Sequence, residues 1–385
     1  MTHDDRQRAL LAGAEEVLPL AREDAQANEM RGGISERLLA AMHEQRLFRL
    51  WIPRSVGGEE LGLVPSMRIF ETVAGADGAA GWAVMIGAGA GLFGGFLERE
   101  AAREIFEPAD ALIAGSGSPQ GTARETDRGY RVSGRWAYAS GARNATWFTA
   151  GCIVQGPDGR ARTNAAGEPL IRAVAVPADD VVIYDTWAVA GLRGTGSEDF
   201  EIPDRFVPTT HTFSVMTDAP REDGPLYRFP FFSIAELSFA AVSLGIARHA
   251  LDEFRSMAQT KRPGGTGTLL RDDPDVQSRF AAAEAAVRAS RAMTYDIAAR
   301  AWDEVERGDP LSQTLRSDVR LAALDTSHRC ARAVDLLYER AGMTPLFTAS
   351  PFGRAWRDVH AVTQNIVVSA GHYVEVGKAL LGGTH

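Results

Sequence analysis

GYRVSGRWAYASG, residues 129–141, is the stretch that decides the fold of this chain. Large side chains recur along it at the spacing of a β-strand, and it ends in the small residues Ser140 and Gly141. A Gly/Ser-rich segment precedes it at residues 115–123, and a second, GLRGTGS, follows at residues 191–197. Neighbouring runs of β-branched and aromatic residues alternate with polar ones, so we predict a β domain around this stretch.

Helical periodicity returns on both sides of the β region. Residues 79–89 are so small and apolar that a helix there must pack closely against something. Four long helices, typical of an antiparallel bundle, are predicted after the β region at residues 234–257, 275–306, 310–341 and 354–381. The sequence thus predicts an α+β chain with an N-terminal helical domain (1–110), a central antiparallel β domain (111–215) and a C-terminal four-helix bundle (225–385).

Composition narrows the function classes. The net charge is −9 and the charges are mixed, so no basic run indicates nucleic-acid binding. No run approaches the roughly 18 unbroken apolar residues of a membrane span, and the charged N-terminus lacks the apolar core of a signal peptide. Cys152 and Cys330 lie far apart without metal-binding spacing, which favours a reducing cytoplasm and no metal.

Polar and aromatic residues gather in the three β segments. Gly-rich loops can present successive backbone N–H groups to an anion, and a strand end can offer a hydroxyl and an unshielded N–H. The candidate binding residues are Ser116, Gly121, Thr122, Trp136, Tyr138, Ser140, Gly141, Thr195 and Ser197. Taken singly, each loop is equally compatible with an ordinary β-turn that carries solvated serines.

The order of helices, β domain and helical bundle resembles the acyl-CoA dehydrogenase superfamily. Two motifs make the chain most similar to its two-component flavin-dependent monooxygenase branch, namely SGRWAYASG at residues 133–141 and RDVH at residues 357–360. The resemblance implies FMN or FAD, supplied in reduced form by a partner flavin reductase, and a homotetramer. It also implies that Trp136, Tyr138, Ser140 and Gly141 contact the flavin, and that Ser116 and Thr122 lie on its binding loop.

The dehydrogenases of this superfamily need a carboxylate base, which most of them carry shortly after the Arg-Asp pair. Here that stretch holds Asn365 and Ile366, and neither can act as a base at neutral pH. Glu236 lies near the position used by a minority of the family but is offset by one residue, about 100° around a helix. A dehydrogenase or oxidase with an atypical base therefore stays an alternative.

The hydroxylases of the branch usually carry a histidine near Asn365, which this chain lacks. On one continuous helix, Asn365, Ser369 and His372 would share a face, so His372 is a candidate substitute. We expect Ser140 to donate a hydrogen bond to oxygen held at the flavin.

A dry substrate pocket is expected to include Trp82, Met85, Phe93 and Glu236. The favoured function is oxidation by O2 of a small aromatic or natural-product-type substrate. A non-catalytic flavin-fold binding subunit is the second alternative.

Overall fold

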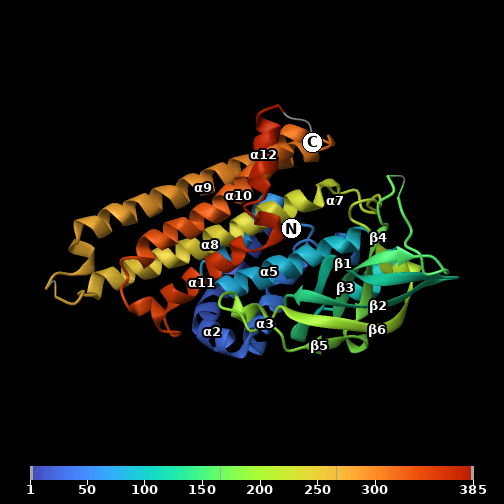
Figure 1. The fold of residues 1–385 in the computed structure, drawn as a ribbon, viewed down its shortest axis with the longest axis horizontal. Helices are drawn as coiled ribbons and strands as arrows, with labels where there is room; N and C mark the ends of the chain where they lie inside the picture. Colours follow the sequence, from blue (N-terminus) through green and yellow to red (C-terminus); the bar gives the residue numbers. More distant parts are fainter. Residues whose placement is uncertain (1–2, 165, 266, 383–385) are drawn as a thin grey trace.

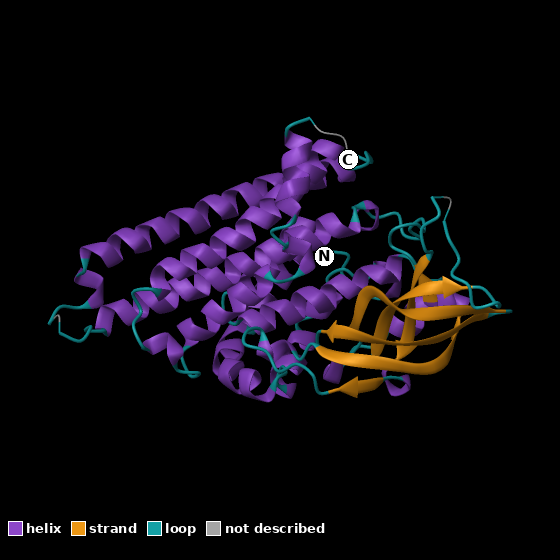
Figure 2. Ribbon diagram, in the orientation of Figure 1, coloured by secondary structure: helices purple, strands orange, loops and turns teal. Residues whose placement is uncertain are grey.

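The computed structural model describes residues 3–164, 166–265 and 267–382. Helices occupy both ends of the sequence and pack into one elongated body, and a β-sheet projects at one end of it (Figures 1 and 2). This arrangement confirms the predicted α+β order of N-terminal helices, central sheet and C-terminal helices.

The N-terminal helices begin where short polar side chains can cap them. Ser35 Oγ accepts a hydrogen bond from Leu38 N at 3.2 Å, and Asp77 Oδ2 accepts one from Ala80 N at 3.0 Å. Asp77 therefore fixes the start of the helix that carries Trp82. The helices are α1 (His3–Glu16), α2 (Leu18–Arg31), α3 (Glu36–Glu44), α4 (Leu63–Ala74), α5 (Gly78–Gly91) and α6 (Arg99–Phe106).

The sheet has seven strands within the described residues, in the order β5-β6-β2-β1-β3-β4-β7. The strands are β1 (Ile113–Thr126), β2 (Gly129–Ala139), β3 (Trp147–Gln155), β4 (Ile171–Pro177), β5 (Val182–Tyr184), β6 (Glu198–Pro208) and β7 (Thr212–Phe213). All neighbours pair antiparallel except β1 and β3, which run parallel. The prediction of an antiparallel domain is wrong for this one pair. The chain reverses direction once before β2 and once after it, so β3 runs in the same direction as β1 when it pairs with the other edge of β1.

The first Gly/Ser segment is not the loop that its composition predicts. Residues 115–123 lie inside β1, and the ladder to β3 shifts register between Ser116 and Gly121. Such a bulge leaves the extra residues unpaired. Here they are the exposed residues 117–120, which include Pro119, a residue that a regular ladder would not tolerate.

The C-terminal part is a helical bundle whose last member is broken. Its long helices are α8 (Phe231–Thr260), α9 (Pro274–Glu306) and α10 (Gln313–Tyr338), preceded by the short α7 (Pro225–Arg228) and followed by α11 (Pro351–Thr363) and α12 (His372–Leu380). The single helix predicted over residues 354–381 is therefore wrong. Asn365 Oδ1 accepts a hydrogen bond from Val367 N at 3.0 Å, and this local bond competes with continuation of the helix.

Two apolar helices form the centre of the molecule. Residues Gly78–Gly95 and Phe231–Thr260 are long and apolar enough to cross a membrane by length and composition, but 78% of the apolar 18-residue window in each is buried inside the fold. They are core helices: α5 packs against α4 and α8, and the body of the molecule surrounds them (Figure 1). The expected close packing of the small-residue helix is thus observed.

Candidate functional site

Three of the predicted hydroxyl residues meet at the end of β2. Ser140 Oγ lies 2.7 Å from Ser197 Oγ, and Ser197 Oγ lies 2.7 Å from Thr195 Oγ1. Thr195 and Ser197 are buried, and Ser140 is partly exposed. Ser140 thus joins two residues that lie 57 and 55 positions further along the sequence. We call this connected group the hydroxyl chain (Ser140, Ser197 and Thr195).

The direction of the hydroxyl chain follows from its two ends. Thr195 Oγ1 donates to the Leu192 carbonyl at 2.8 Å, and Trp82 Nε1 donates to Ser140 Oγ at 3.0 Å. A hydroxyl has one hydrogen to donate and an indole N–H can only donate. Ser197 must therefore donate to Thr195, and Ser140 must donate to Ser197.

This direction corrects the role expected of Ser140. Its hydroxyl hydrogen is already used toward Ser197, so the remaining capacity of Ser140 Oγ is to accept a further hydrogen bond. Ser140 is thus an acceptor in this arrangement and not the predicted donor.

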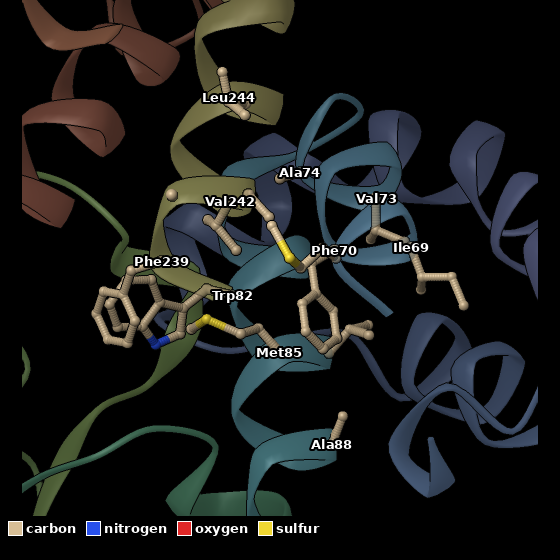
Figure 3. Packing of buried hydrophobic residues seen from close by; sticks show 14 of the residues in the cluster. Ile69, Phe70, Val73, Ala74, Trp82, Met85, Ala88, Phe239, Val242 and Leu244 are labelled. Carbon is tan, nitrogen blue, oxygen red and sulfur yellow. The ribbon is translucent and has the colours of Figure 1, made fainter. Parts of the chain in front are cut away.

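Aromatic and sulfur-containing side chains surround the end of the hydroxyl chain at which Trp82 donates to Ser140. The ring of Trp82 meets that of Phe239 edge-on, with centroids 4.9 Å apart, and Met85 lies beside them (Figure 3). Phe93, further along, packs against Phe213 at 4.9 Å and is only partly buried. Trp82 and Met85 belong to the main apolar cluster, against which Phe93 packs, and Met85 is almost entirely within the core. Their expected place in a substrate pocket stays a prediction.

Tyr138 stands exposed at the same strand end. It is 72% exposed, its φ is +71°, and its ring meets that of Trp187 edge-on at 6.1 Å. A positive φ is uncommon for a residue other than glycine and is found at functional sites more often than elsewhere. Gly141, next to Ser140, donates its N–H to Thr195 O at 2.8 Å, so this N–H is not the free donor that was predicted.

The chain is similar to known proteins in both sequence and structure. Residues 237–370 match the model of the acyl-CoA dehydrogenase C-terminal domain. The chain is 31% identical to an indole-3-acetate monooxygenase of Pseudomonas putida, over 97% of this chain and 92% of that protein. The chain belongs to the flavin-dependent monooxygenases of the acyl-CoA dehydrogenase superfamily.

Two further similarities agree with this assignment. The monooxygenase is 30% identical to the flavin-dependent monooxygenase oxygenase subunit HsaA of Rhodococcus jostii, over 90% of this chain and 91% of that one. The crystal structure of a 3-HSA hydroxylase from Rhodococcus sp. RHA1 is similar at a TM-score of 0.89 and 27% identity, covering 98% and 97% of the two chains. Flavin-dependent oxidation, predicted from the strand motif, is thereby confirmed over the dehydrogenase alternative.

The residues at the Ser140 corner fit the ring of a flavin. Tyr138 offers an uncovered aromatic face, and Ser140 has one unused acceptor position. Gly141 has a φ of +75°, and a Cβ atom there would meet no other atom within 4 Å, so the corner is open on this side. A planar ring with N–H groups suits an aromatic wall beside a hydrogen-bond acceptor.

The monooxygenase does not use Trp136 as such a wall. The Trp136 side chain is 0% exposed, stacks on Phe200 at 5.2 Å and donates to the Gly151 carbonyl at 2.8 Å. Gly121, also predicted to bind cofactor, lies over this ring, and a Cβ there would come within 2.0 Å of Trp136 Cζ2. Both residues therefore pack the interior of the sheet domain.

Ser116 and Thr122 lie on β1, and their pairing partners are residues outside the hydroxyl chain. Ser116 pairs with Ala150 of β3, and Thr122 pairs with Ser133 of β2. The hydroxyls of Thr122 and Ser133 lie 3.4 Å apart. Within the described part of the chain, no hydrogen bond joins Ser116 or Thr122 to Ser140.

Glu236 and His372 are linked to each other through two intermediates. Glu236 Oε1 accepts from Arg320 Nε at 2.7 Å, and Arg320 also pairs with Glu375 at 2.8 Å. His372 Nδ1 lies 3.3 Å from the same Glu375 carboxylate, and its Nε2 lies 2.8 Å from the Ile366 carbonyl. Burial raises the pKa of Glu236, and the Arg320 charge opposes that rise.

The expected face of Asn365, Ser369 and His372 does not exist, because the helix ends at Thr363. Asn365 caps the turn at Ile366–Val368, and His372 begins α12. Asn365 and His372 thus hold the break between α11 and α12.

Asp358 is a buried residue near the hydroxyl chain that was not among the predicted site residues. Its Oδ1 accepts from Leu192 N at 2.6 Å, which ties α11 to the turn before Thr195. Burial and the neighbouring Asp77 carboxylate raise the pKa of Asp358 to about 7, while Leu192 N–H and Arg354 oppose the rise. Its position on the apolar stripe of α11, between Phe352 and Val362, is a sequence signal that could have singled it out.

Asp358→Asn is expected to stabilise the monooxygenase above neutral pH. The folded-state pKa of about 7 lies above the ordinary value of 3.8, so the folded protein holds this proton more tightly. In the unmodified protein, the contribution of protonated Asp358 to the free energy of unfolding is full below the ordinary pKa. This contribution is lost as pH rises toward about 7, by at most about 1.4 kcal/mol per pH unit. Asparagine keeps an oxygen for Leu192 N without ionising.

Thermal unfolding of both proteins between about pH 5 and pH 8 measures this difference. We expect the Tm of Asp358→Asn to exceed that of the unmodified enzyme by an amount that grows with pH. A constant difference across this range would contradict the buried-charge interpretation.

A separate cavity of about 370 Å³ lies between α8 and α9. Phe254, Arg255 and Phe280 are among its lining residues, and none of the predicted site residues contacts it. Among the described residues no cluster of His, Cys, Asp or Glu could hold a metal ion.

Proposed function

We propose that this enzyme takes reduced flavin, FMN or FAD, from a separate flavin reductase and uses it with O2 to hydroxylate an electron-rich aromatic or natural-product-type substrate. Two relatives support this proposal: one is named for its action on indole-3-acetate, and the other is an oxygenase subunit. A separate oxygenase component needs another component that delivers electrons.

The observation that carries the proposal is the directed hydroxyl chain that ends at an exposed aromatic corner. We assign the flavin ring to Tyr138, Ser140 and Gly141, with Thr195 and Ser197 supporting Ser140 from behind. When bound in its reduced form, flavin supplies the electrons that activate O2. A reduced flavin carries a hydrogen on ring nitrogen N5 that the oxidised form lacks, and an acceptor at Ser140 favours the reduced form.

The remaining site residues exclude water and hold the fold. We assign Trp82, Met85 and Phe93 to the dry wall on which an aromatic substrate packs. Glu236 is engaged by Arg320, which disfavours its use as the base of a dehydrogenase. We assign Asn365 and His372 to closing the C-terminal turn, since their hydrogen bonds to Val367 N and to the Ile366 carbonyl lie there.

The decisive experiment mixes the enzyme and anaerobically reduced FMN or FAD with ¹⁸O₂ and an aromatic acceptor, either indole-3-acetate or a simple phenol. We expect hydroxylated product that carries one ¹⁸O atom, because the oxygen comes from O2. Mass spectrometry of the product and a peroxide assay measure the outcome. Enzyme mixed with free flavin that has been oxidised beforehand is the matched control and should give no product.

Two other outcomes would point to the alternatives. Bleaching of enzyme-bound oxidised flavin by acyl-CoA thioesters, without oxygen incorporation, would favour a dehydrogenase with an atypical base. Failure to bind either form of FMN or FAD at micromolar concentration would favour a non-catalytic binding subunit.

We further propose a cytoplasmic homotetramer. Exposed apolar side chains in the C-terminal part of the sequence support an assembly, since large apolar residues are costly to leave in water. They are Met343, Leu346, Phe347, Ile366 and Val374.

A further inference from the structure

One buried carboxylate holds the loop that joins β5 to β6. Asp358 Oδ1 accepts from Leu192 N at 2.6 Å, and both residues are buried. The loop also lies directly on the backbone of α11. A Cβ atom on Gly191 would come within 2.2 Å of the Arg357 carbonyl oxygen, so only glycine permits this approach.

Leu192 is the residue at which this anchor meets the hydroxyl chain. Its φ is +52°, a left-handed conformation that a leucine rarely adopts and that its surroundings must hold. Its carbonyl accepts from Thr195 Oγ1 at 2.8 Å, from Thr195 N at 3.1 Å and from Trp187 Nε1 at 3.0 Å. Fixing the N–H of Leu192 in this conformation therefore also fixes the direction of its carbonyl.

The position of Asp358 is set by charges on two helices. Asp77, which caps α5, lies 3.4 Å from Arg354 Nε on α11, and Arg354 also attracts the Asp358 carboxylate. Glu29 on α2 pairs with the neighbouring Arg357. The group of Asp77, Arg354 and Asp358 thus contacts both ends of the hydroxyl chain. Asp77 caps the helix that carries Trp82, and Asp358 binds the turn at Leu192.

We propose that Asp358 is a positioning residue that sets the hydrogen-bond direction of the hydroxyl chain. By holding the N–H of Leu192 it keeps the Leu192 carbonyl as the last acceptor, and Ser140 is thereby left as an acceptor toward the flavin. This inference rests on the proposed function, because it assigns the flavin to the Ser140 corner. Asp358 itself contacts neither flavin nor substrate.

The consequence is a preference for one redox form of the flavin. With the chain directed as observed, Ser140 accepts a hydrogen bond and so selects reduced flavin, whose N5 carries a hydrogen. Without Asp358 the Leu192 turn is released and Thr195 loses its fixed acceptor. The three hydroxyls can then reverse, and Ser140 can donate to the unprotonated N5 of oxidised flavin.

The test measures the dissociation constants of reduced and oxidised FMN under anaerobic conditions for the unmodified enzyme and for Asp358→Ala, Asp358→Asn and Thr195→Val. We expect the ratio of oxidised to reduced Kd to fall about tenfold in Asp358→Ala and in Thr195→Val. The ratio should stay within about threefold in Asp358→Asn, which retains an oxygen for Leu192 N. Asp335→Ala is the matched control, because Asp335 bonds His360 and Trp356 of the same helix without touching the loop.

A purely structural role would weaken both flavin forms together, so an unchanged ratio in Asp358→Ala overturns the inference. A fall of this ratio in Asp358→Asn as large as that in Asp358→Ala overturns the inference as well, since the retained hydrogen bond to Leu192 N would then have no effect. If Asp358→Ala does not fold, Thr195→Val and Asp358→Asn still decide the question. Binding of neither flavin form by the unmodified enzyme would instead overturn the proposed function.

Discussion

Replacing Ser140 by alanine is expected to weaken binding of reduced flavin about tenfold and to release most of the consumed O2 as H2O2. Alanine removes the acceptor that faces the flavin and leaves the indole N–H of Trp82 without its partner. A buried donor left unpaired costs about 1–3 kcal/mol, and a tenfold loss of affinity corresponds to about 1.4 kcal/mol. Anaerobic titration with reduced FMN gives the affinity, and a peroxide assay beside product analysis gives the coupling.

Ser133→Ala is the matched control for this prediction. Ser133 lies on β2, the strand that Ser140 directly follows, but among the described residues its hydroxyl is hydrogen-bonded only to Thr122, at 3.4 Å. We expect this variant to retain both affinity and coupling. Equal behaviour of Ser133→Ala and Ser140→Ala, in either direction, would remove Ser140 from the site.

The parts of the fold that follow from local periodicity were predictable. The strand at residues 129–141 and the helices α8, α9 and α10 have apolar spacings that identify them without any distant contact. The break after Thr363 was missed because apolar spacing continues through it, whereas the structure is decided by the side chain of Asn365. The segment 115–123 was misassigned because Gly and Ser are typical of loops and a bulged strand also uses them.

The candidate site was predicted as a set of residues but not as an arrangement. Ser140, Thr195 and Ser197 were named from their strand-end and loop positions, and their mutual contact depends on how β6 pairs with β2. The direction of their hydrogen bonds depends on Leu192 and Asp358, which are 166 positions apart. No spacing in the sequence encodes such a contact.

The error about Trp136 has a specific cause. The motif resemblance implied that both Trp136 and Tyr138 contact the flavin, and strict alternation would place the two side chains on the same face of a strand. The ladder between β2 and β6 shifts register between Trp136 and Ala139, and Tyr138 takes a positive φ. This bulge buries Trp136 and turns Tyr138 outward, so one local irregularity separates a packing residue from a proposed binding residue.

Trp136→Ala is consequently expected to lower the free energy of unfolding by about 3–5 kcal/mol, since it removes a fully buried indole that stacks on Phe200. Trp136→Phe retains an aromatic ring but leaves the Gly151 carbonyl without its donor, and we expect a loss of about 1–3 kcal/mol. Denaturant unfolding measures both. The Kd of Trp136→Phe for reduced flavin should stay within about threefold of that of the unmodified enzyme. Such a change is smaller than the tenfold change that corresponds to about 1.4 kcal/mol.

Tyr138→Ala gives the opposite pattern and completes the argument. Its side chain is 72% exposed, so the free energy of unfolding should change by no more than about 0.5 kcal/mol. Affinity for reduced flavin should fall about tenfold, because a stacking surface is lost. If Trp136→Phe instead lost flavin while Tyr138→Ala kept it, the bulge would not separate the two roles, and the flavin would lie on the other side of β2.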